Sequence, residues 1–148
     1  MPEDTSALEF RTPWHLWAVG ILGLLWNALG AFDYLMTETR NAGYMGQFSP
    51  EQLDFFYGLP AWAVAFWAIA VWGGLLGAIL LLMRKRLAVP VLLISLVSMV
   101  VTAIRNYVFA SGMEVTGGSG LAFTVVIFVV AVALWLYGRR MARTGVLV

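Results

Sequence analysis

The sequence contains no cysteine and only one histidine, His15, among its 148 residues. Without cysteine the chain offers no disulfide, no thiolate nucleophile and no thiolate metal ligand. A single histidine supplies neither a multi-histidine metal site nor a pair of axial haem ligands. We therefore expect no metal site, no cofactor held by the protein alone, no catalytic residue and no enzymatic activity. His15 itself is expected to be an anchor at the membrane interface.

Charged residues are scarce as well. They make up 11% of the chain, against about 25% in soluble domains, and hydrophobic residues make up 61%. Polar groups are too few to cover a water-exposed surface, which predicts that a lipid bilayer is the solvent. The formal net charge is +1, so nothing indicates a nucleic-acid partner.

Four continuous apolar runs are long enough to span a membrane, which takes roughly 20 residues per helix. They cover about residues 14–36, 60–83, 88–109 and 119–137. None of them alternates between polar and apolar residues, so helices are expected rather than barrel strands. Residues 1–148 are therefore predicted to form one all-α domain, a polytopic membrane protein with a bundle of four transmembrane helices.

The loop charges predict an orientation. Basic residues gather between the second and third runs and after the fourth: Arg84, Lys85, Arg86, Arg139, Arg140 and Arg143. The other two connections contain the acidic residues Glu38, Glu51, Asp54 and Glu114. Since Lys- and Arg-rich loops stay in the cytoplasm, both termini are predicted to be cytoplasmic.

Two connections have their own signatures. Residues 49–52, Ser-Pro-Glu-Gln, match a capping box that opens a short helix. Leu53, Phe56 and Tyr57 would share one face of that helix, which predicts that it lies on the membrane surface. Residues 113–120 contain Gly-Gly-Ser-Gly and are predicted to be a flexible turn.

Polar side chains at bilayer depth are costly, and they supply the candidate binding residues. Asn27 and Tyr34 share one narrow face of the first run with several glycines, and Ser98, Thr102 and Arg105 share one face of the third. Both faces are expected to point into the bundle and toward each other. The candidate residues of this polar seam are Asn27, Asp33, Tyr34, Ser98, Thr102 and Arg105.

Two interpretations of the polar seam stay open. It is either a packing surface with a structural ion pair, since Asp33 and Arg105 share one outer layer, or a polar cavity open to the outer face. The small residues of the second run, Ala70, Gly73, Gly74 and Gly77, predict a helix-packing surface. The fourth run has Thr124 as its one buried polar candidate, so it is expected to face lipid or another subunit.

Residues 26–34 (Trp-Asn-Ala-Leu-Gly-Ala-Phe-Asp-Tyr) and 56–62 (Phe-Tyr-Gly-Leu-Pro-Ala-Trp) resemble segments of a known group of proteins. The group consists of small proteobacterial inner-membrane proteins that often carry the label sugar transporter. The resemblance runs from about Arg11 into the third run. It implies a multi-pass protein of the bacterial inner membrane, and it carries over no binding residue.

Two functions follow as hypotheses. The first is a carrier or binding protein for a small solute, which would work as a homo-oligomer because four helices are few to enclose a path. The second is a non-catalytic auxiliary or structural subunit of a larger membrane complex. The glycine-rich second run and the apolar fourth run would then be docking surfaces.

Overall fold

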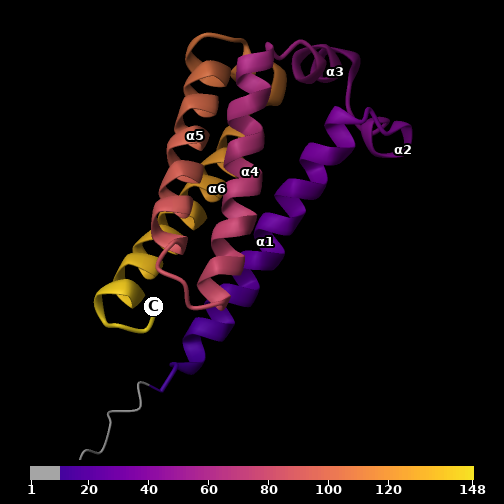
Figure 1. Cartoon of the computed structure of the whole chain (residues 1–148). Helices are drawn as coiled ribbons and strands as arrows, with labels where there is room; N and C mark the ends of the chain where they lie inside the picture. Colours follow the sequence, from indigo (N-terminus) through magenta and orange to yellow (C-terminus); the bar gives the residue numbers. More distant parts are fainter. Residues whose placement is uncertain (1–10) are drawn as a thin grey trace, which may run out of the picture.

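The computed structural model describes residues 11–148, which form six helices and no strand (Figure 1). Four of the helices are long and apolar enough to cross a membrane: α1 (Trp14–Glu38), α4 (Ala61–Leu82), α5 (Ala88–Val108) and α6 (Gly112–Arg143). Two short helices, α2 (Ala42–Met45) and α3 (Pro50–Tyr57), connect α1 to α4. The predicted all-α architecture with four candidate spans is confirmed.

The capping box at the start of α3 forms as predicted. The Gln52 backbone N–H donates to Ser49 Oγ at 3.3 Å, and the Ser49 backbone N–H donates to Gln52 Oε1 at 3.0 Å. The sequence did not predict α2. Asn41 caps this helix, because its Oδ1 accepts a hydrogen bond from the Tyr44 backbone N–H at 3.0 Å.

The fourth span is interrupted near its start and extends beyond its predicted end. Helical residues begin at Gly112, but the φ of 67° and ψ of −171° at Gly117 suit glycine alone and separate a short first segment from a long second one. The long segment follows this kink, close to the predicted start near residue 119, and continues to Arg143 instead of ending at 137. Most of residues 113–120 are helical, so the predicted flexible turn is limited to the kink at Gly117. The apolar run ended too early because the arginine-rich last turns are helical too.

The two ends of the bundle differ in charge. The basic end carries the connection between α4 and α5, with Arg84, Lys85 and Arg86, and the last turns of α6. The acidic end carries α2, α3 and the start of α6.

The helices pack in the order α1, α4, α5, α6. α4 packs against both α1 and α5, and α6 packs mainly against α5. Figure 1 shows α4 and α5 side by side, whereas α1 crosses α4 and diverges from it toward α2. α4 can contact two neighbours closely because Ala70, Gly74 and Gly77 leave its surface flat, which confirms the predicted packing surface.

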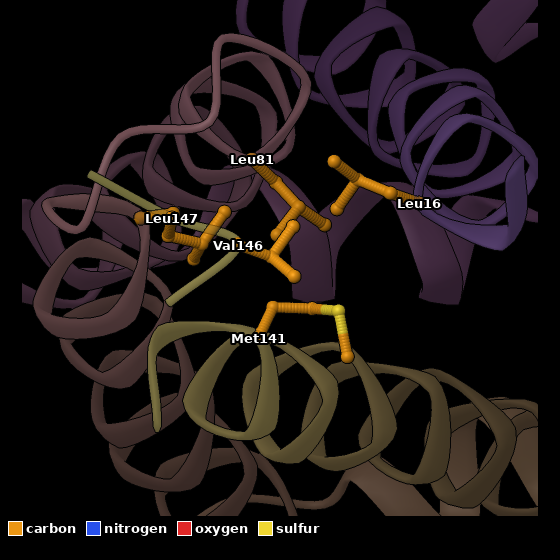
Figure 2. Close-up of a cluster of buried hydrophobic side chains, with 6 residues drawn as sticks. Leu16, Leu81, Met141, Val146 and Leu147 are labelled. Carbon is orange, nitrogen blue, oxygen red and sulfur yellow. The ribbon is translucent and has the colours of Figure 1, made fainter. Parts of the chain in front are cut away.

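A cluster of buried apolar side chains lies at the basic end (Figure 2). It consists of Leu16, Leu81, Ala88, Met141, Val146 and Leu147. Residues 144–148 reach it by folding back after α6. The Val148 backbone N–H donates to the Arg84 carbonyl at 2.7 Å, and the Arg86 backbone N–H donates to the Val148 carbonyl at 3.0 Å. This segment ties α6 to the connection between α4 and α5.

Candidate functional site

The middle of the predicted polar seam is a three-helix contact rather than a two-helix one. Gly74 of α4 lies between Asn27 of α1 and Ser95 of α5, and a Cβ at this position would overlap the Asn27 amide oxygen. The same Cβ would lie 3.3 Å from Ser95 Oγ. The expectation that the faces of the first and third spans meet directly is therefore wrong. Matching depth along two helices does not make them neighbours when a third helix of small residues fits between them.

The polar groups of the seam bond to backbone carbonyls. Asn27 Nδ2 donates to the Gly23 carbonyl at 2.7 Å, and Thr102 Oγ1 donates to the Ser98 carbonyl at 2.9 Å. The buried Ser95 hydroxyl crosses to α4 and donates to the Ala70 carbonyl at 2.5 Å. Ser98 is also buried. Each of these three bonds satisfies one side-chain donor where lipid offers no partner.

The charged layer near the acidic end is not an ion pair. Asp33 Oδ1 accepts a hydrogen bond from the Tyr44 hydroxyl of α2 at 2.5 Å. Arg105 Nη1 donates to Asn106 Oδ1 at 3.2 Å, and its guanidinium lies 5.5 Å from the ring centre of Phe55 in α3. The predicted pairing of Asp33 with Arg105 is wrong. Each charge finds a partner from a short loop helix instead, because α4 separates α1 from α5.

Two tyrosines sit near Asp33 and differ in role. Tyr34 packs its ring edge-on against Trp67 and Trp72 of α4, with ring centres 4.9 and 6.3 Å away. Tyr44 lies outside the spans. Burial, and then the hydrogen bond and negative charge of Asp33, raise the pKa of Tyr44 to about 12, so the phenol stays protonated. The Tyr44 hydroxyl therefore remains a donor to Asp33 at neutral pH.

A cavity of about 480 Å³ lies at the basic end, between the start of α1 and the end of α6. Its polar lining residues are His15, Tyr137, Arg140 and Thr144, and Pro13, Met141 and Val146 complete it. His15 Nδ1 and the Tyr137 hydroxyl are hydrogen-bonded at 2.5 Å, and their rings meet edge to face. The volume falls in the usual range for small-molecule sites, roughly 300–1,000 Å³.

None of the six predicted seam residues lines this cavity. His15, predicted only as an interfacial anchor, also bonds to Tyr137, and this bond was not predicted. Both residues lie at the same interface in the predicted topology, and that shared depth was the available signal. The pairing itself depends on α1 meeting α6, which no local pattern shows.

Other sources of functional information are negative. Among residues 11–148, no group of three or more His, Cys, Asp or Glu side chains is placed to hold a metal ion. No family model, no curated protein and no solved structure matches the chain.

Proposed function

We propose that the chain is a bacterial inner-membrane protein that binds a small polar solute at the basic-end cavity and acts as a carrier. The observation that carries this proposal is the convergence of His15, Tyr137, Arg140 and Thr144 on one cavity of about 480 Å³. Two aromatic rings and several hydrogen-bonding groups are what a sugar-sized, hydroxyl-rich solute needs. The resemblance of residues 26–34 and 56–62 to proteins labelled sugar transporters supports the same class of ligand.

The polar seam has a structural role in this proposal. Its donors bond to backbone carbonyls and Gly74 fills the space between α1 and α5, so the seam leaves little room for a solute path. We therefore assign the path to the contact between copies of the chain in a homo-oligomer. The basic end, and with it both termini, would face the cytoplasm.

The exposed surface of α6 favours a second candidate, a non-catalytic auxiliary subunit. Only 6% of the most apolar stretch of α6 is buried within the chain, against 22–28% for the other three spans. Its exposed side chains toward the acidic end include Leu121, Phe123, Val125, Val126, Phe128 and Val129. Lipid or a larger partner would cover such a face equally well.

Gentle extraction followed by native mass spectrometry separates the two candidates. The solute-binding function predicts a homo-oligomer that retains a small molecule, and Arg140→Gln should release that molecule while the oligomer persists. Lys85→Gln is the matched control, since Lys85 lies at the same end and outside the cavity. A stoichiometric foreign protein, with no retained solute in the wild type, would instead establish the auxiliary-subunit function.

A further inference from the structure

A second cavity at the basic end, of about 270 Å³, is shallow and wide open, and its lining differs from that of the first. Three arginines line it, Arg86 from the connection between α4 and α5 and Arg139 and Arg143 from α6. Val89 and Ala142 complete its walls. Arg139 and Arg143 are one helical turn apart, so they project from the same face of α6.

Two of the three arginines are held in place by neighbouring groups. Arg86 Nη2 donates to the Ala142 carbonyl at 3.1 Å, and the Arg86 backbone is fixed by its bond to Val148. The Arg139 guanidinium lies 4.8 Å from the ring centre of Trp135, a cation–π contact. Because these two side chains are already partly ordered, an anion that binds here would cost them less conformational entropy.

The cavity has three positive side chains and no negative one among residues 11–148, although the terminal carboxylate of Val148 lies at the Arg86 backbone N–H. The described acidic residues all lie toward the acidic end, in or beside the last turns of α1, in α3 and at the start of α6. Guanidinium groups match phosphate geometry through paired N–H donors, so a phosphate-bearing anion is the ligand chemistry that fits.

The surroundings of the cavity favour a lipid over a free phosphate. Leu136 lies one turn before Arg139 on the same face of α6, and Leu93 and Val97 follow Val89 at four-residue steps on α5. All three of these side chains are exposed and apolar. We propose that the cavity binds the phosphate group of an anionic phospholipid, whose acyl chains run along these residues toward the centre of the span.

Lipid titration of the purified full-length protein tests the proposal. Phosphatidylglycerol or phosphatidylcholine is added in detergent, and bound lipid is counted by native mass spectrometry. R139Q/R143Q removes two cavity charges and spares Arg86, whose side chain also has a structural bond. R11Q/K85Q is the matched control, because it removes two exposed positive charges from the same end and neither residue lines either cavity. Circular dichroism checks that both variants keep their helix content.

The wild type is expected to prefer phosphatidylglycerol, and R139Q/R143Q should weaken its binding about a hundredfold, which is about tenfold for each charge-assisted hydrogen bond lost. The control should change it less than about threefold, which allows for the loss of general attraction alone. An equal loss in both variants, or no preference over phosphatidylcholine, would overturn the site. If millimolar inorganic phosphate displaces the phosphatidylglycerol, the occupant is free phosphate and the lipid assignment is wrong. None of these outcomes depends on solute retention in the first cavity.

Discussion

Three polar side chains inside the bundle, those of Asn27, Ser95 and Thr102, each bond to a nearby backbone carbonyl. Asn27 and Thr102 donate one turn back along their own helices, and Ser95 donates across to α4. Of these three residues, Ser95 alone adds a hydrogen bond between helices, which contributes roughly 0.6–2 kcal/mol in membrane proteins. Close packing against glycine supplies the rest of the contact, since a larger residue at position 74 would separate the three helices.

Gly74→Ala should destabilise the protein by about 1–3 kcal/mol, because the new Cβ overlaps the Asn27 amide and overpacks the contact. The free energy of unfolding in detergent, followed by circular dichroism, is the measurement. Gly30→Ala is the control, since its Cβ meets only Val71 at 3.9 Å. The double variant Asn27→Ala with Gly74→Ala should recover most of the loss. A double variant no more stable than Gly74→Ala would show that Asn27 is not the obstacle.

Asp33 should couple to Tyr44 and not to Arg105. Tyr44→Phe breaks the 2.5 Å bond and Asp33→Asn replaces its charged acceptor with a weaker amide oxygen, so their effects on unfolding should be non-additive by about 1 kcal/mol. The effects of Asp33→Asn and Arg105→Gln should instead add to within about 0.5 kcal/mol. Two double-mutant cycles in the same detergent provide the comparison. Coupling confined to the Arg105 cycle would restore the ion pair predicted from depth alone.

The Tyr44 contribution should also depend on pH in a defined direction. Its pKa rises from 10.0 to about 12 in the folded protein, so the folded state holds the phenol proton more tightly than the unfolded state does. The resulting stabilisation is complete below pH 10 and is lost as the pH rises to about 12. The difference in stability between wild type and Tyr44→Phe should therefore be constant from pH 7 to 9 and shrink above pH 10. A difference that grows with pH would contradict the assignment.

At the scale of the helices, apolar runs predicted the existence of every span but not all of their limits. The first three spans end within two residues of their predicted ends, because charges or turn residues follow the apolar run closely. α6 extends beyond its run on both sides, since its polar first turn and its arginine-rich last turns are helical too. A hydropathy pattern marks where a helix meets lipid, whereas helix ends depend on capping and on contacts such as that of residues 144–148.

The kink in α6 offers a test confined to one residue. Gly117→Ala should cost about 1–3 kcal/mol, because a φ of 67° with a ψ of −171° is strained for any residue with a Cβ. No atom lies within 4 Å of the added methyl, so the cost comes from the backbone alone. Gly118→Ala is equally open and has no positive φ, and it should be neutral or slightly stabilising. Equal stability of the two variants would mean that α6 straightens without penalty.

At the scale of the whole molecule, the packing order α1, α4, α5, α6 determines which predicted contacts between helices form. Depth along a span follows from residue counting, and it correctly put Asn27 and the third-span hydroxyls in the interior. Lateral neighbours do not follow from depth, and the small residues of α4 placed it between the two polar faces. The bond between His15 and Tyr137 was not predicted for the same reason, since it also depends on which helices are lateral neighbours. Contacts between the first and last helices depend on tilt and packing, and neither has a local sequence signature.

The proposed orientation, with the basic end in the cytoplasm, predicts which positions can be labelled from outside the cell. Single cysteines at Gly46 and Ser111 should react with a membrane-impermeant thiol reagent in intact cells, and one at Lys85 should react only after the cells are opened. All three positions are exposed, so burial cannot account for a difference. Lys85 is a better inner probe than Ala88, because Ala88 is fully buried and would be inert on either side of the membrane. The chain has no native cysteine, so background labelling should be absent.

Labelling at Lys85 alone in intact cells would show that the bundle has the opposite orientation. The arginine-lined cavity would then lie outside, and the loop charges would not have predicted the orientation. Labelling at all three positions would mean that α4 and α5 do not separate these loops across a bilayer.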